Sequence, residues 1–122
     1  MLASIGWILV VSGLITAGGG AAALISPRLL LRLGFGDGSA SNSAVFVVRH
    51  WGVLIFAVGA LTVYSAYAPS IRVPVLVAAA AEKFAIGVLV FFGPLKRTAG
   101  MTAIALMDGL FAVLYVAYLA LA

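Results

Sequence analysis

The amino-acid sequence predicts an all-α, polytopic membrane protein, an antiparallel bundle of four transmembrane helices that forms one domain over residues 1–122. The first observation is the composition: 66% of the residues are hydrophobic and only 8% are charged. A soluble domain of this length has no room to bury so much apolar surface. Second, four apolar segments each reach the roughly 20 residues that a helix needs to cross a bilayer. None alternates like a barrel strand, and helices pair their backbone groups internally.

The first two spans end next to prolines. The first covers residues 5–25 and is followed by Pro27, and the second covers residues 44–68 and is followed by Pro69. Proline fits in a first helical turn or just past a last one, which supports both ends. No basic residue precedes the first apolar run, which is longer than the core of a signal peptide, so we expect a transmembrane helix there.

The last two spans have similar boundaries. The third covers residues 73–93, with Pro74 in its first turn and Pro94 directly after its end, and the fourth covers residues 99–121. Residues 34–43 are rich in glycine, serine and asparagine, a composition typical of a loop. The other connections are short, as expected for a compact bundle without a soluble domain.

The first loop begins with a leucine-rich stretch that contains Arg28 and Arg32. A spacing of four residues places both arginines on one face of a helix, as in a short interfacial helix that lies on anionic headgroups. A frayed end of the first span that carries cytoplasmic charge fits the same residues equally well. Both interpretations stay open from the sequence.

Basic residues in the loops predict the orientation. The first loop contains Arg28 and Arg32, the third contains Lys96 and Arg97, and the second contains only Arg72. Because lysine and arginine are enriched in cytoplasmic loops, the first and third loops are expected in the cytoplasm. The protein is then expected in the inner (plasma) membrane with both termini outside, and Arg72 in a wet outer loop.

Tyrosines are expected to mark the outer interface of the membrane. Four of them fall near the outer ends of the second and fourth spans: Tyr64, Tyr67, Tyr115 and Tyr118. Tyrosine is enriched at the headgroup level, where its ring is apolar and its hydroxyl is wet. These positions therefore predict an aromatic belt.

Ionisable residues inside the spans are the most informative feature of the sequence. They are Arg49 and His50 in the second span, Glu82 and Lys83 in the third, and Asp108 in the fourth. Each charge costs at least about 2.5–3.5 kcal/mol at the bilayer centre unless it is paired or wet. At about 1.5 Å per residue all five lie in the inner half of the membrane. We therefore expect one cluster of inward-pointing charges, with an ion pair between the second span and the third or fourth.

This cluster has two interpretations. In the structural one, Arg49 pairs with Asp108 and Lys83 pairs with Glu82 or a carbonyl, and the pairs fix the order of the helices. In the functional one, the cluster lines a site for a polar headgroup, a proton or a reacting lipophile. A carboxyl group would then exchange protons with His50 as its partner, while Arg49 or Lys83 holds an oxyanion. The candidate catalytic residues are thus His50, Glu82 and Asp108, and the candidate ligand-binding residues are Arg49, Trp51 and Lys83.

The composition also limits the cofactors. The chain has one histidine and no cysteine, so we expect no metal site, no iron–sulfur cluster and no haem held by two histidines. The net charge of +4 is spread between apolar runs and forms no face for phosphates. We therefore expect neither a cofactor nor a nucleic-acid partner.

Small residues recur at helical spacing in two spans. Gly13, Ala17 and Ala21 follow one another at intervals of four in the first span, and the second span has Gly52 and Gly59 on the face of its charges. Small-xxx-small patterns let helix backbones approach closely. They predict tight helix contacts, within the bundle or between protomers.

Three local patterns carry a family resemblance: Arg-His-Trp-Gly at residues 49–52, Glu82-Lys83 in the third span and Asp108-Gly109 in the fourth. Together with the four spans, they make the chain similar to small bacterial four-helix membrane proteins of the DoxX-like kind. The resemblance implies a membrane subunit or accessory of an oxidoreductase system. A more distant likeness to sterol-isomerase-like bundles has no residue-by-residue match in the acids and histidines.

Two classes of function follow. The chain is a non-catalytic membrane subunit or scaffold, or it is an intramembrane enzyme or binder for a lipophilic substrate such as a quinone, an isoprenoid or a sterol-like compound. The sequence leaves open whether it is an enzyme. The expected partners are the lipid bilayer, a membrane protein or a second copy of the chain, and a lipophilic small molecule.

Overall fold

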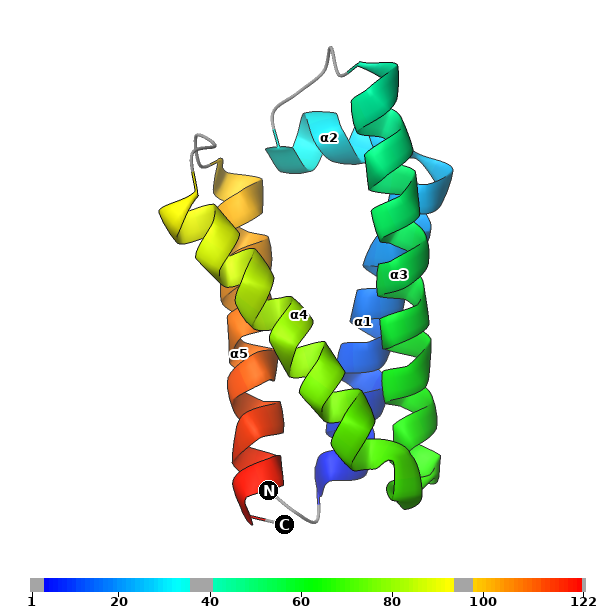
Figure 1. Ribbon diagram of the computed structural model, residues 1–122, viewed down its shortest axis with the longest axis vertical. Helices are drawn as coiled ribbons and strands as arrows, with labels where there is room; N and C mark the ends of the chain where they lie inside the picture. The colour runs from blue at the N-terminus through cyan, green and yellow to red at the C-terminus, as the bar shows by residue number, and fades with distance from the viewer. Residues whose placement is uncertain (1–3, 36–40, 94–97, 122) are drawn as a thin grey trace.

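The computed structural model describes residues 4–35, 41–93 and 98–121, and every element in them is a helix. The elements are α1 (Ile5–Ile25), α2 (Pro27–Phe35), α3 (Asn42–Tyr67), the short 3-10 helix η2 (Pro69–Ile71), α4 (Arg72–Phe92) and α5 (Ala99–Leu121) (Figure 1). The four long helices are each long and apolar enough to cross a membrane. The predicted all-α class is thus confirmed, and the predicted spans agree with these helices to within one or two residues.

Local chemistry explains where the helices begin and end. Ser41 caps α3, because its hydroxyl accepts a hydrogen bond of 3.2 Å from the amide of Ala44. Proline follows one residue after each of two helices, because Pro27 opens α2 after α1 and Ser26, and Pro69 opens η2 after α3 and Ala68. Since proline lacks an amide donor, it is accommodated in a first turn but not in the middle of a helix.

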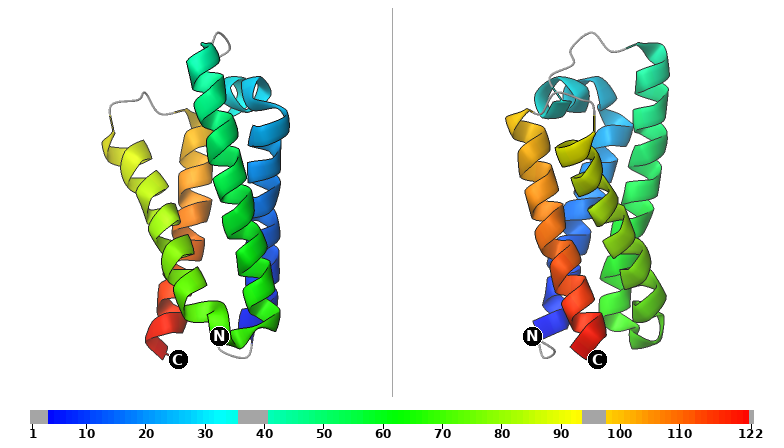
Figure 2. Two further views of the ribbon diagram at one scale, coloured as in Figure 1. Left: turned by 45° about the vertical axis from the view of Figure 1, so that its right-hand side comes forward. Right: turned by 60° about the vertical axis from the view of Figure 1, so that its left-hand side comes forward.

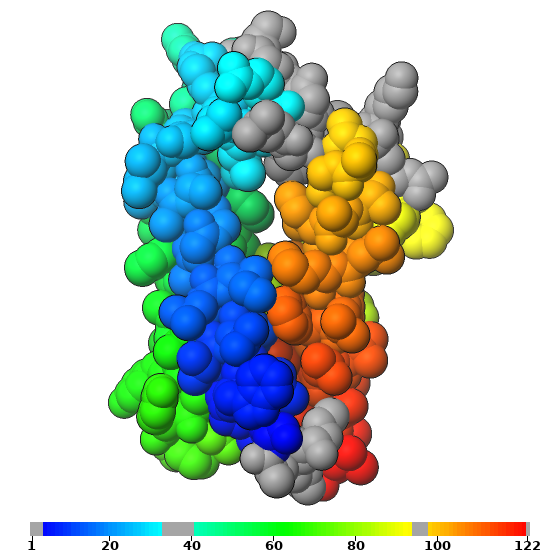
Figure 3. Space-filling view, turned by 180° about the vertical axis from the view of Figure 1, so that it is seen from behind, coloured from blue at the N-terminus to red at the C-terminus, as the bar shows by residue number. Residues whose placement is uncertain are grey.

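The long helices form two pairs. Figure 2 shows α1 beside α3 and α4 beside α5, with the two termini at one end of the molecule and α2 lying across the other end. Helix α4 is close to α3 near η2 and diverges from it toward the α2 end (Figure 1). Seen from behind, the molecule is hollowed between the α1–α2 side and the first half of α5 (Figure 3). The two pairs therefore meet most closely at the end that carries the termini.

Glycines bring the backbones of α1 and α3 into contact. A Cβ atom added at Gly52 would lie 2.7 Å from the carbonyl oxygen of Gly20, and one added at Gly13 would lie 2.7 Å from that of Gly59. An added Cβ at Gly20 would likewise meet the backbone of Phe56. Only glycine fits at such an approach. Gly13, Gly52 and Gly59, which the sequence singled out, therefore pack within the bundle, between α1 and α3.

A cluster of buried side chains joins the two pairs at the terminal end. Leu9 of α1, Leu76 and Ala79 of α4 and Tyr115 of α5 are all inaccessible to solvent. The prediction that Tyr115 belongs to an aromatic belt is therefore wrong. The hydroxyl of Tyr115 donates a hydrogen bond to Ser12 of α1, whereas Tyr64 is exposed.

Arg72 is also placed differently from the prediction. It does not lie in a wet loop, because it opens α4 and is half-buried. Its guanidinium donates 2.6 and 2.7 Å hydrogen bonds to the carbonyl oxygens of Ser65 and Ala66, and a 3.4 Å bond to the hydroxyl of Tyr118. The last carbonyls of a helix have no partner within that helix, and a cation is favourable there. Arg72 therefore caps the end of α3 and ties it to α4 and α5.

Replacing Arg72 by methionine is expected to destabilise the bundle by about 1–2 kcal/mol, because the substitution removes charge-assisted hydrogen bonds to partly buried carbonyls. The measurement is reversible unfolding in mixed micelles, followed by circular dichroism. Arg32→Met at an exposed site of α2 is the matched control and should leave stability unchanged. Equal losses in the two variants would contradict the capping role.

The leucine-rich stretch of the first loop forms a separate helix, α2. Of the two interpretations left open, a frayed end of the first span is wrong, because Ser26 ends α1 before α2 begins. Leu31 packs on Val45 of α3, while Arg28 and Arg32 are exposed. Lys96 and Arg97, which also entered the orientation argument, lie outside the described residues.

Candidate functional site

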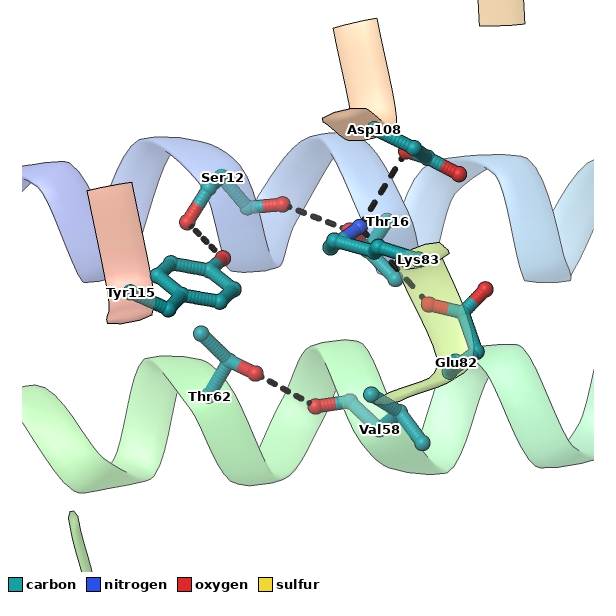
Figure 4. A network of polar contacts seen from close by, with 8 residues as sticks. All are labelled: Ser12, Thr16, Val58, Thr62, Glu82, Lys83, Asp108 and Tyr115. Atoms are coloured by element: carbon teal, nitrogen blue, oxygen red, sulfur yellow. Dashed lines mark hydrogen bonds and ion pairs between the residues drawn. The ribbon is translucent and has the colours of Figure 1, made fainter. Parts of the chain in front are cut away.

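Lys83 is the centre of a polar network inside the bundle (Figure 4). Its side chain, on α4, is only 1% exposed. Its Nζ lies 3.2 Å from Oδ1 of Asp108 on α5 and donates a 2.9 Å hydrogen bond to Oγ1 of Thr16 on α1. It also lies 5.7 Å from the ring centroid of Phe111, within the range of a cation–π contact. One ammonium group therefore binds three helices together.

Hydroxyl groups of α1 extend this network toward the terminal end. Thr16 donates a 2.8 Å hydrogen bond to the carbonyl oxygen of Ser12, and the buried hydroxyl of Tyr115 donates to Oγ of Ser12. Thr16 is therefore oriented so that its oxygen is free to accept from Lys83. Ser12 and Thr16 stand four residues apart on α1, and neither of them, nor Tyr115, was identified from the sequence as a partner in the network.

The hydrogen bond between Tyr115 and Ser12 lends itself to a double-mutant cycle. Tyr115→Phe and Ser12→Ala each remove one partner while nearly keeping the shape of the core. Hydrogen bonds between membrane helices are worth about 0.6 kcal/mol on average and at most about 1.7. We expect the coupling energy, measured by unfolding in mixed micelles, to lie in that range. A coupling energy of zero would contradict the hydrogen bond. Tyr64→Phe, at an exposed tyrosine, is the control without an expected effect.

Glu82 lies farther from Lys83 than Asp108 does. Its Oε2 is buried and lies 3.9 Å from Nζ of Lys83, a distance too long for a hydrogen bond, and it has no hydrogen-bond partner among the described residues. Figure 4 shows its other carboxyl oxygen pointing away from Lys83. Because Lys83 is closer to Asp108, the carboxylate of Glu82 is the less compensated of the two.

Glu82 also lines a groove of about 280 Å³ between α3 and α4. Trp51 and three aliphatic side chains of α3 form one wall, and Glu82, Ala85 and two larger aliphatic side chains of α4 form the other. Glu82 is the single charged residue among them. The groove occupies the space where α4 diverges from α3, and its chemistry is that of a site for a lipophilic molecule with one polar contact.

The structure does not bring Arg49 and His50 into this network. Both side chains are exposed on α3, and the ion pairs of the described residues join Lys83 with Glu82 and with Asp108. The expectations that Arg49 points inward, that it pairs with Asp108 and that an ion pair reaches the second span are therefore wrong. His50 is likewise not placed to exchange a proton with either acid.

The reason is that the buried face of α3 does not include Arg49, although Gly52 and Gly59 were predicted from the sequence to lie on the face of the charges. Gly52, Ile55, Gly59 and Thr62 are buried on that face, and Arg49 lies outside it. In addition, α4 diverges from α3 toward the end of α3 that carries Arg49 (Figure 1). A charge at this position therefore meets the surroundings of the protein rather than the acids of α4 and α5.

The arrangement is suited to binding and to holding helices together. Within the described residues, no group of three or more potential ligands could hold a metal ion. Of the six candidate site residues, Glu82, Lys83 and Asp108 come together, and Trp51 shares a groove with Glu82. No family model, curated protein or solved structure matches this chain.

Proposed function

We propose that this chain is an integral protein of the inner membrane, an antiparallel four-helix bundle that acts as a non-catalytic subunit or scaffold. The contact of Lys83 with both Asp108 and Thr16 carries the proposal. A buried ammonium that is bound on two sides by its own protein holds helices in place and is not available to a reacting molecule. The earlier resemblance to DoxX-like proteins, which implies a membrane subunit or accessory, is part of the same proposal.

Purification in a mild detergent, followed by mass spectrometry of what remains bound, tests the proposal. A stoichiometric membrane-protein partner, or a stable oligomer of the chain itself, is the expected result. Recovery of an isolated bundle with one retained lipophile would instead favour the second candidate function below. An isolated bundle with nothing bound would contradict both.

The second candidate function is binding of a lipophilic molecule between α3 and α4. The specific observation in its favour is the groove in which Glu82 is the only charged lining residue and Trp51 the only aromatic one. Under this candidate, Glu82 supplies the polar contact of the ligand. The bundle held by Lys83 then serves as the rigid wall of the site.

The proposed orientation places both termini outside, and the absence of cysteine makes it directly measurable. Single cysteines at Ser43 and Ser70, both exposed in the structure, report on the two sides. We expect a membrane-impermeant maleimide to label Ser70→Cys in intact cells and Ser43→Cys only after permeabilisation. The reverse pattern would overturn the orientation.

A further inference from the structure

The charges around Glu82 indicate what the groove binds. Two carboxylates, Glu82 and Asp108, face one ammonium, that of Lys83, so the formal charge of the group is −1. The ammonium lies 3.2 Å from Asp108 and 3.9 Å from Glu82 and also donates to Thr16. The charge left uncompensated therefore belongs to Glu82, the residue that lines the groove.

An ionised carboxylate in apolar surroundings is unfavourable unless a cation or several donors accompany it. Oε2 of Glu82 is buried beside Lys83 without a hydrogen-bond donor among the described residues, whereas the other carboxyl oxygen points away from Lys83 (Figure 4). The attraction between opposite charges is also stronger here than in water, because the effective dielectric constant is lower. A protonated amine that contacts the other carboxyl oxygen of Glu82 supplies the missing positive charge.

We propose that the groove between α3 and α4 binds a lipophilic amine, with its ammonium group on Glu82 and its apolar chain against the aliphatic walls toward Trp51. Trp51 and Val58 on the α3 wall are seven residues apart, which corresponds to about 10 Å along the helix and leaves room for the alkyl chain of the amine. This inference rests on the second candidate function and adds the chemical class of the ligand. An alcohol would satisfy the hydrogen bond but not the charge, and a fatty acid would be repelled.

Trp51 provides a direct measurement of binding. The chain has two tryptophans, and Trp7 is exposed on α1, so Trp7→Phe leaves Trp51 as the only tryptophan, inside the groove. The Trp7→Phe protein is placed in nanodiscs of zwitterionic lipid, and its fluorescence is titrated with n-decylamine, n-decanol and n-decanoate. The three probes share a chain and differ in the charge of the head.

We expect n-decylamine to bind at least tenfold more tightly than n-decanol, and n-decanoate to bind most weakly. Glu82→Gln keeps the size of the side chain and removes its charge, so the preference for the amine should disappear in this variant. Asp37→Asn, in the loop expected from the sequence, makes the same change of net charge and should keep the preference. Ala85→Phe, which fills the groove, should weaken the binding of all three probes.

The possible results separate the two levels of the proposal. If n-decylamine and n-decanol bind the Trp7→Phe protein with equal affinity, the amine inference is overturned, and no variant at Glu82 is needed for that conclusion. Binding of a lipophilic molecule in the groove would still stand. A preference that survives Glu82→Gln, or binding that is unaffected by Ala85→Phe, also overturns the amine inference. If no probe gives a saturable signal, the amine inference and the second candidate function both fail.

Discussion

Lys83→Met is expected to destabilise the bundle by about 3–5 kcal/mol, the largest single effect in the chain. The methionine fills most of the volume of the lysine but leaves Asp108 and Glu82 as two partly buried carboxylates without the ammonium that lies 3.2 and 3.9 Å from them. It also removes the donor to Thr16, and with it the link from α4 to α1. Reversible unfolding in mixed micelles, followed by circular dichroism, measures the loss.

A second substitution distinguishes this mechanism from a simple packing defect. Replacing a buried ion pair by apolar residues of similar size is often nearly neutral, whereas breaking the pair is not. We therefore expect Lys83→Met together with Asp108→Leu to recover most of the stability that Lys83→Met loses. If the double variant is as unstable as the sum of the two single ones, the pair is not the source of the loss.

Gly59→Ala is expected to destabilise the bundle by about 3 kcal/mol, the upper part of the usual range for an added methyl group in a packed interior. The added Cβ would meet the backbone of Ala17 and, at 2.6 Å, the carbonyl oxygen of Gly13. Backbone atoms within a helix have no rotamer to change, so α1 and α3 must separate along their contact. Unfolding in mixed micelles again gives the free energy.

Gly18 and Gly109 are the matched controls for this substitution, because a Cβ added at either has no neighbour within 4 Å. Alanine is favoured over glycine in a helix by about 1 kcal/mol. Gly18→Ala and Gly109→Ala should therefore leave the stability unchanged or raise it slightly. A Gly59→Ala variant that behaves like them would mean that α1 and α3 do not lie as close as described.

The helices could be predicted from the sequence because their boundaries rest on local chemistry. Apolar runs of sufficient length and prolines at their ends gave α1 and α5 at their observed bounds and α3 and α4 to within one or two residues. The spacing of small residues in α1 and α3 also predicted tight helix contacts, without the partners. The sequence did not predict which helices form pairs, because small residues allow a close approach without specifying the partner.

The site could be predicted only in part. Lys83 and Asp108 were expected to be buried because an unpaired charge within a span is costly, and the structure pairs them. The same argument placed Arg49 inside and was wrong, since the cost depends on which face of the helix carries the charge. Thr16 and Tyr115 were missed because hydroxyl groups are tolerated in a span even without an interhelical partner, so their presence alone indicates nothing.

A chain that enters a bilayer in the order of its sequence delivers α4 before α5. Glu82 and Lys83 are neighbours in α4, so their formal charges cancel over the middle of the segment. Asp108 is the only charged residue of α5, and it arrives when the ammonium of Lys83 is already in place to receive it. In the proposed membrane arrangement, Lys83→Met therefore leaves Asp108 without its partner while α5 is being inserted, so less assembled bundle should accumulate in the membrane fraction, as an immunoblot would measure.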